Sequence, residues 1–231
     1  IAVEDGYPNS NVAGVTNTYE WVVPANPSSK ARIRVEDASR PDELWDQSDY
    51  NFNIAGVSIL YPNGPVPIGA EWKKGEARSI TWQQNAVGND ATVEFSYDGG
   101  VTYENVVAPG VLLPLIDEAA PPFTPTIPTV RGLVRITPED PSPFTNVVDT
   151  SDAMFIVAGI KVEEPVLDTE YTIGETNLIT FIAAGTHDVG FTADIYYSGD
   201  GVNFETNNPI RLNQIFNETY PGINFYNWTV G

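Results

Sequence analysis

Two stretches of this chain concentrate carboxylates that could bind a divalent cation. The candidate ligands are Asp37, Asp42, Asp46 and Asp49 in the first stretch and Asp149 and Asp152 in the second. Calcium prefers several oxygen ligands from loops of this kind, although neither stretch has the spacing of an EF-hand. Side chains in a segment such as residues 46–49 can also cap turns by bonding backbone amides. The sequence predicts calcium at one or both loops, with turn capping as the alternative.

The residues present give little support for covalent or acid–base catalysis. The chain has no cysteine, which removes thiolate nucleophiles and Cys-ligated zinc. Its single histidine, His187, stands in a turn-like segment, and no nearby serine has a nucleophile-elbow sequence. Two carboxylates held ~5–10 Å apart in a cleft could hydrolyse a glycosidic bond. Because acidic residues are abundant, however, chance pairs are expected, and we predict that the protein is not an enzyme.

Aromatic side chains could stack on a sugar if several of them shared an exposed face. The candidates are Trp72, Trp82, Tyr196, Tyr197 and Trp228. Most of these residues alternate with polar ones, which favours places in a core. Trp72 and Trp45 fall outside the clearest alternating segments, so we expect these two to be exposed.

Two short segments match the acceptor pattern for N-glycosylation. Asn217 begins Asn-Glu-Thr, and Asn227 begins Asn-Trp-Thr. Matches of three residues are close to chance in a chain rich in Asn and Thr, and Asn227 lies within a segment predicted to be a strand. Glycosylation at Asn217 and Asn227 is therefore predicted from the pattern alone.

The elements that must hold these side chains are strands. Apolar and polar residues alternate, with many β-branched and aromatic side chains, over residues 31–35, 79–82, 92–97, 193–197 and 224–230. The 19 glycines and 19 prolines interrupt the chain too often for long helices. A single helical turn is expected near residues 42–45. The sequence predicts an all-β protein of antiparallel sheets.

The net charge narrows the range of partners. There are 31 acidic and 11 basic residues, which gives a formal charge of −20. Such a field repels nucleic acid and anionic lipid, so we expect neither as a partner. No apolar run approaches the ~18 residues that a membrane span needs, and no direct membrane insertion is expected. The charge instead suits a hydrated surface in a salty or extracellular setting.

The sequence also repeats itself with a period of roughly 100 residues, the size of one β-sandwich domain. Residues 75–82 return as 174–181, and 93–99 return as 195–201. The order Arg34-Val35, residues 46–49 and Ala55-Gly56 returns as Arg135-Ile136, residues 149–152 and Ala158-Gly159.

The repeat predicts three units, which are residues 1–55, 56–158 and 159–231, the first and last incomplete. We expect a strand to run through each Ala-Gly junction, with Gly56 and Gly159 supplying backbone freedom, so that the units form a semi-rigid rod. Incomplete units would expose strand edges. Further chain could cover these edges, or strands of neighbouring chains could pair there.

Two resemblances follow from these motifs. Residues 96–103, Ser-Tyr-Asp-Gly-Gly-Val-Thr-Tyr, resemble the Asp-box, a hairpin of sialidases and other β-rich secreted proteins that lies away from their catalytic centre. With Ile80-Thr81-Trp82, residues 19–24 and the Arg34 and Asp46 segments, the chain resembles the tandem Ig-like or fibronectin-like repeats of bacterial S-layer and large cell-surface proteins.

The resemblance implies tandem Ig-like antiparallel β-sandwich domains and a structural role in an extracellular, cell-surface scaffold. The implied partners are copies of the chain in a lattice or array, and cell-surface glycans. The alternative is a carbohydrate-binding or adhesion module of a secreted multidomain protein. A flat array of exposed aromatic side chains would favour that alternative, and burial of these side chains would favour the scaffold.

Overall fold

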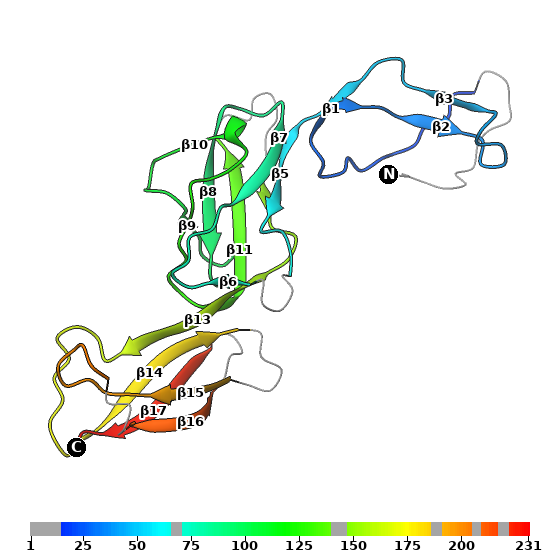
Figure 1. The fold of residues 1–231 in the computed structure, drawn as a ribbon. Coiled ribbons are helices and arrows are strands. Elements are labelled where there is room, and N and C mark those ends of the chain that lie inside the picture. The colour runs from blue at the N-terminus through cyan, green and yellow to red at the C-terminus, as the bar shows by residue number, and fades with distance from the viewer. Residues whose placement is uncertain (1–14, 66–70, 140–146, 186–190, 205–208, 217–221) are drawn as a thin grey trace.

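The regular structure of this chain is all-β, as the sequence predicts. The computed structural model describes residues 15–65, 71–139, 147–185, 191–204, 209–216 and 222–231. Within these ranges, strands are accompanied only by one short 3-10 helix, η1 (Leu115–Asp117). The strands form several sheets, and Figure 1 shows them in three groups that follow one another along the chain.

The first group consists of two short antiparallel pairs. β1 pairs with β4, and β2 pairs with β3. No side chain described between residues 15 and 55 is buried, and Val35 is 70% exposed. Within residues 15–55, these four strands therefore pair without a core of their own. Their bounds are β1 (Ser28–Ala31), β2 (Arg34–Glu36), β3 (Trp45–Gln47) and β4 (Phe52–Ile54).

The middle group contains a two-stranded sheet and part of a larger one. β5 pairs with β7, while β8 lies between β11 on one side and β9 and β10 on the other. β12 adds to β11. The bounds are β5 (Gly56–Tyr61), β6 (Trp72–Lys73), β7 (Thr81–Asn85), β8 (Asp90–Ser96), β9 (Glu104–Asn105), β10 (Leu113–Pro114), β11 (Thr129–Pro138) and β12 (Asp149–Thr150).

A single hydrophobic core joins the two sheets of the middle group. It combines buried side chains of β5 and β7 with those of β8 and β11. Phe95 lies among other rings, with centroids 6.0 Å from Trp72, 4.9 Å from Phe123 and 5.7 Å from Phe155. Because alternate residues of a strand face opposite sides, Val93 and Phe95 point into this core while Glu94 points away.

The third group has a smaller core. β14 pairs with β17, and β15 pairs with β16. Ile179, Phe181 and Ala183 are buried on β14, with Tyr226 and Trp228 of β17 partly buried against them. The bounds are β13 (Phe155–Glu164), β14 (Thr176–Ala184), β15 (Phe191–Ile195), β16 (Arg211–Phe216) and β17 (Ile223–Thr229).

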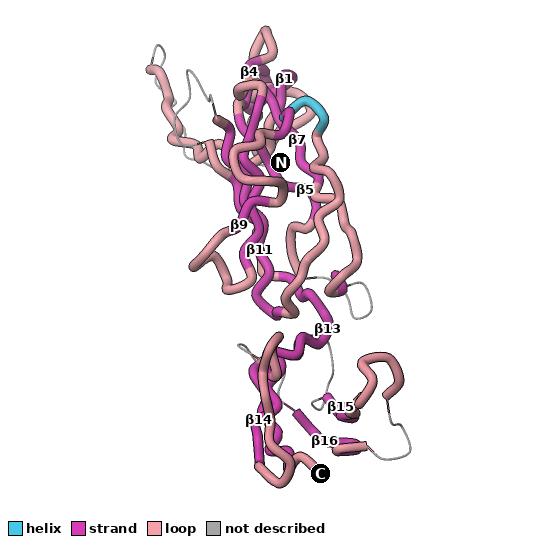
Figure 2. Tube along the Cα trace, turned by 90° about the vertical axis from the view of Figure 1, so that its left-hand side faces the viewer, coloured by secondary structure: helices cyan, strands magenta, loops and turns pink. Residues whose placement is uncertain are grey.

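One continuous strand, β13, links the middle and third groups. Its first residues pair with β11, and from Gly159 onward it pairs with β14. Figure 2 shows β13 between the strands of the middle group and those of the third. The expected strand through Ala158-Gly159 is thus present, whereas at the first junction Ala55 separates β4 from β5.

The sheets depart from a purely antiparallel arrangement at β6. This short strand pairs with β13 in parallel, with Trp72 opposite Val157. Along the chain, β6 lies between β5 and β7, which pair with each other in another sheet, so consecutive strands belong to different sheets. Such a change of sheet is one way in which the corners of packed sheets are formed.

Strand pairing in the middle group recurs in the third. The β5–β7 and β13–β14 pairs each have one register shift near the end of the first strand, and a cis X-Pro bond follows in both. The corresponding pairs are Gly56–Asn85 with Gly159–Ala184, and Ile59–Trp82 with Val162–Phe181.

Pairing in the first group also matches the middle group. The β1–β4 and β11–β13 pairs share a register shift, and β2 and β3 pair as β11 and β12 do. Even single hydrogen bonds correspond, because Ser48 N donates to Ile33 O at 2.8 Å and Ser151 N donates to Val134 O at 2.9 Å. The repeated sequence motifs therefore form repeated local pairings.

Some details of the predicted elements differ. Residues 31–35 do not form one strand, because β1 ends at Ala31 and β2 begins at Arg34. The helical turn expected at residues 42–45 is not formed as a helix. A hydrogen-bonded turn is present instead, with Leu44 N donating to Arg40 O at 3.0 Å, and Trp45 already belongs to β3. This turn thus ends where β3 begins.

Candidate functional site

Of the four candidate ligands in the first group, Asp37 and Asp42 lie in the turn between β2 and β3, Asp46 lies on β3, and Asp49 follows β3. Asp37 accepts hydrogen bonds from the amide and hydroxyl of Ser39 at 2.8 and 2.6 Å and lies 3.5 Å from Arg40. The Ser39 donors hold the pKa of Asp37 below its ordinary value. Asp42, Asp46 and Asp49 are exposed. Asp37 therefore caps this turn. Within residues 46–49, for which turn capping is the alternative, Ser48 Oγ accepts a hydrogen bond from Ile33 N at 3.2 Å.

The second acidic stretch connects β12 to the first strand of the middle group. Asp149 accepts a hydrogen bond from Ile59 N at 2.6 Å. Partial burial, with a smaller contribution from the negative charge of Asp152, raises the pKa of Asp149. Asp152 contacts Asn63 twice, through its carboxylate at 2.8 Å and its amide at 2.7 Å. Asp149 thus connects β12 to β5, and Asp152 connects the segment after β12 to the segment after β5.

The six predicted ligands do not come together. Within the described ranges, no three His, Cys, Asp or Glu side chains are arranged so that they could hold a metal ion. Asp149 and Asp152 are neighbours, but the four acids of the first group belong to another part of the fold. Calcium binding by these loops stays a prediction, which melting temperatures with calcium and with a chelator would test.

The Asp-box hairpin forms with the contacts expected of it. Asp98 accepts hydrogen bonds from the amides of Val101 and Thr102 at 3.0 and 2.9 Å and from the Thr102 hydroxyl at 2.6 Å. Ser96 Oγ donates to Asp98 at 2.8 Å and accepts from Gly100 N at 2.8 Å. In the third group the corresponding residue, Asp200, accepts from Asn203 N at 2.7 Å. The motif closes hairpins, which is a structural role.

Replacing Asp98 with asparagine is expected to destabilise the middle group mainly above pH 4. The Thr102 hydroxyl and amide are the main donors that lower the pKa of Asp98 from 3.8 to about 2. A lowered folded-state pKa gives stability that is present above the unfolded value and lost as the pH falls toward the folded one. Urea denaturation should show a deficit of about 1 kcal/mol for the variant at pH 7. The deficit should shrink between pH 4 and 2, so a pH-independent difference would contradict this role.

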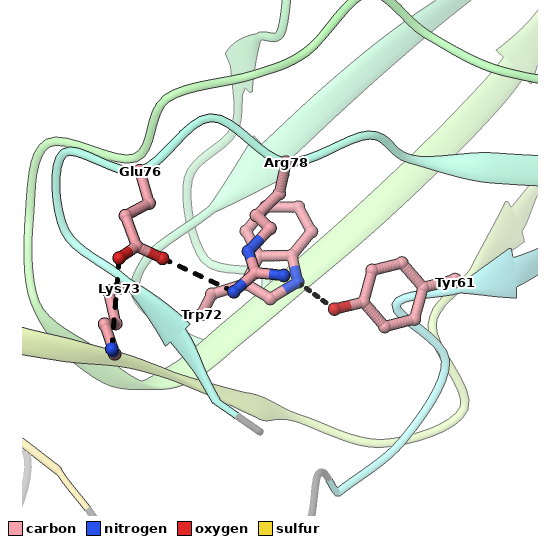
Figure 3. A network of polar contacts seen from close by, with 5 residues as sticks. All are labelled: Tyr61, Trp72, Lys73, Glu76 and Arg78. Atoms are coloured by element: carbon pink, nitrogen blue, oxygen red, sulfur yellow. Dashed lines mark hydrogen bonds and ion pairs between the residues drawn. The ribbon is translucent and has the colours of Figure 1, made fainter. Parts of the chain in front are cut away.

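The tryptophans that could have formed a sugar-binding face are mostly in the core. Trp72 and Trp82 are both fully buried, so the expectation that Trp72 is exposed is wrong. The cause is β6, which places Trp72 beside Phe155, at a centroid distance of 5.2 Å. Trp72 Nε1 donates to the Tyr61 hydroxyl at 2.7 Å, as Figure 3 shows.

The remaining aromatic candidates do not share one face. Trp45 is 50% exposed, as expected, and the Arg34 guanidinium lies 4.7 Å from its ring centroid. Tyr197 is 46% exposed and contacts Trp228, whose ring is partly buried. Trp45 belongs to the first group and Tyr197 to the third, so these exposed rings do not line one flat surface.

A charged cluster beside Trp72 is exposed and weakly held. Glu76 lies 3.9 Å from Lys73 and 3.4 Å from Arg78, and Figure 3 shows its carboxylate between the two cations. The three side chains are 41–59% exposed. Exposed pairs of this kind contribute little stability.

Two polar contacts were not predicted from the sequence. Asn63 binds Asp152, and Arg135 binds Glu94 at 2.7 Å while lying 3.8 Å from the centroid of Tyr103. Glu94 and Arg135 are both polar positions of alternating strands. Their pairing depends on the register of β8 with β11, which the sequence alone does not specify.

The modification sites and the histidine fall in different parts of the chain. Asn227 is exposed on β17, in a segment predicted to be a strand. Asn217 and His187 lie outside the described residues.

Among the helices that the structure describes, none is long and apolar enough to cross a membrane. No protein-family model, curated protein or solved structure matches this chain.

Proposed function

We propose that this chain is a structural segment of a large exported cell-surface protein, of the S-layer type or a similar extracellular scaffold. Its units would be tandem Ig-like β-sandwiches over residues 1–55, 56–158 and 159–231, joined into a rod. Its partners would be copies of itself in an array, with cations at the acidic loops. In this role no residue takes part in covalent chemistry.

The observation that carries the proposal is the recurrence of strand pairing along the chain. The β5–β7 register returns in β13–β14, and the β11–β13 register returns in β1–β4. A repeated unit that contacts its neighbours in the same way is the construction of extended arrays. The polar motifs repeat as hairpin and loop contacts, which supports an architectural role for the repeat.

Three further features support a scaffold. The charge of −20 keeps the surface hydrated and repels anionic polymers. Trp72 and Trp82, two of the five candidate sugar-binding rings, are buried in the core. The continuous strand β13 joins two groups without a loose linker, which suits a protein that transmits force or sets a spacing.

Immunogold labelling of intact source cells, with antibodies against this chain, tests the proposal. We expect continuous label on the outer surface, and we expect the denatured polypeptide that carries this sequence to be much larger than 25.2 kDa. Label confined to the cell interior would overturn the proposal. Saturable quenching of tryptophan fluorescence by cell-surface glycans, without surface-wide label, would favour the binding-module alternative.

A further inference from the structure

The segment that leads into β11 faces the sheet of the third group. A cavity of about 170 Å³ lies there, and its lining includes two apolar side chains from each group, Ile127, Pro128, Ile182 and Ile223. The first two precede β11, and the others belong to β14 and β17. β11 itself contacts β14. The middle and third groups therefore present apolar side chains to each other at the second junction.

Hydrogen bonds hold this segment in place on the middle group. Thr126 N donates to the Tyr97 hydroxyl at 3.0 Å, and Thr129 Oγ1 donates to Tyr97 O at 2.6 Å. Between these two anchors, Ile127 is half-buried and Pro128 is buried. The segment is thus a fixed part of the surface that the middle group offers to the third.

The first junction brings the corresponding residues together. β1 and β11 correspond through their register with β4 and β13, which aligns Asn26-Pro27 with Ile127-Pro128. In the same way β7 corresponds to β14, which aligns Gln83 with Ile182. β1 contacts β7, as β11 contacts β14. Both junctions therefore use the same surfaces of the repeated unit.

Amide side chains make the contact at the first junction. Gln83 Nε2 donates to Asn26 Oδ1 at 3.0 Å, and Asn85 Nδ2 donates to Ile54 O at 3.0 Å. Asn26 is exposed, so water competes for its bond with Gln83. A hydrogen bond that replaces bonds to water adds little net stability. The first junction is therefore weakly held.

The same two positions of β14 are apolar. Ile182 and Ala184 stand where β7 has its two amides, and Ala184 is buried. Pro128 is buried as well, whereas its counterpart Pro27 is half-buried. Removing apolar surface from water favours contact. The second junction is therefore the more tightly closed of the two.

The backbone connections differ in the same direction. At the second junction β13 runs without a break from the middle group into the third, and beside it Lys74 N donates to Ala158 O at 2.8 Å. At the first junction Ala55 separates β4 from β5. Backbone and side chains thus both make the second junction the firmer one.

We propose that this surface between neighbouring units sets the stiffness of the rod, through the side-chain pairs Asn26–Gln83 and Ile127–Ile182. The polar pair makes the first junction a compliant joint, and the apolar pair makes the second a stiff one. Each surface fits a neighbouring unit whose side chain is of the same class, because an amide that faces isoleucine loses its hydrogen bond. The inference rests on the proposed rod and deepens it by naming the contact that controls its bending.

Distances between spin labels on the full chain test the inference, because the chain has no cysteine of its own. Val35→Cys with Ile116→Cys spans the first junction, and Ile116→Cys with Ile173→Cys spans the second. These side chains are 70%, 79% and 80% exposed, so the labels should not disturb the groups. Pulsed electron–electron double resonance gives the width of each distance distribution, which reports how far the joint bends.

Exchanging the polar pair for the apolar one should stiffen the first junction. Asn26→Ile together with Gln83→Ile should reduce the population of bent conformers by at least about threefold, because the new side chains bury apolar surface. Either substitution alone should instead raise that population by about threefold, since the remaining amide loses its partner. This reversal of sign is specific to two positions that contact each other.

The reciprocal exchange should soften the second junction. Ile127→Asn together with Ile182→Gln should widen the second distribution, while the first stays as it is. Thr81→Ile is the matched control, because Thr81 lies on the same face of β7 as Gln83 but further from the first group, opposite Tyr61. It should leave both distributions unchanged. Circular dichroism should show that every variant keeps its strands.

Two outcomes would overturn the inference. One is a pair of distributions whose widths the double substitutions leave unchanged. The other is a double substitution that acts as the sum of its two single ones, because the two positions would then not contact each other. Neither outcome affects the surface-labelling experiment, so failure of these joints can be told apart from failure of the proposed function.

Discussion

Replacing Phe95 with alanine is expected to cost the middle group about 3–5 kcal/mol of unfolding free energy. Phe95 is fully buried, and its ring contacts Trp72, Phe123 and Phe155. These rings come from separate segments, so their backbones hold them apart and the space cannot collapse fully. The lost contacts and the remaining cavity both add to the cost.

Calorimetry provides the measurement. For a unit of about 100 residues, a loss of this size lowers the melting temperature by at least about 10 °C. Phe225→Ala is the matched control, because Phe225 on β17 is 60% exposed. Its substitution should change the free energy of unfolding by less than about 0.5 kcal/mol. Equal effects of the two substitutions would mean that the aromatic cluster is not the core of the middle group.

The sequence predicts the elements well where local chemistry decides the outcome. The alternating segment at residues 92–97 becomes β8, and the Ser96-x-Asp98 motif closes the hairpin that follows it. Both features depend on neighbours only a few residues away. For this reason the all-β class and the hairpin contacts follow from composition and spacing.

Features that depend on distant partners could not be predicted. Trp72 shows no clear alternating pattern, yet the parallel pairing of β6 with β13 buries it. Likewise, Asp149 looks like a member of an acidic cluster, but the register of the strands aims it at Ile59 N. An aspartate that bonds a backbone amide and an aspartate that binds a cation look the same in the sequence, and only the fold distinguishes their roles.

Replacing Gly159 with alanine is expected to weaken the connection between the middle and third groups. Gly159 has φ of +150°, a conformation that L side chains rarely adopt. An added Cβ would lie 2.9 Å from Lys74 Cβ, in a segment fixed by the hydrogen bond from Lys74 N to Ala158 O at 2.8 Å. The strain and the crowding together should cost about 2–4 kcal/mol.

The equivalent glycine of the first junction provides the control, and it separates backbone conformation from position in the repeat. Gly56 has no positive φ, and a Cβ added to it would lie at an ordinary 3.5 Å from Pro27 Cγ. The expectation that both junction glycines supply special backbone freedom therefore holds only for Gly159. Gly56→Ala should therefore change stability by less than about 0.5 kcal/mol. Hydrogen exchange of amides in β13 and β14 should accelerate in the Gly159 variant alone. Equal acceleration at both junctions would show that the strand through Gly159 does not depend on its unusual backbone.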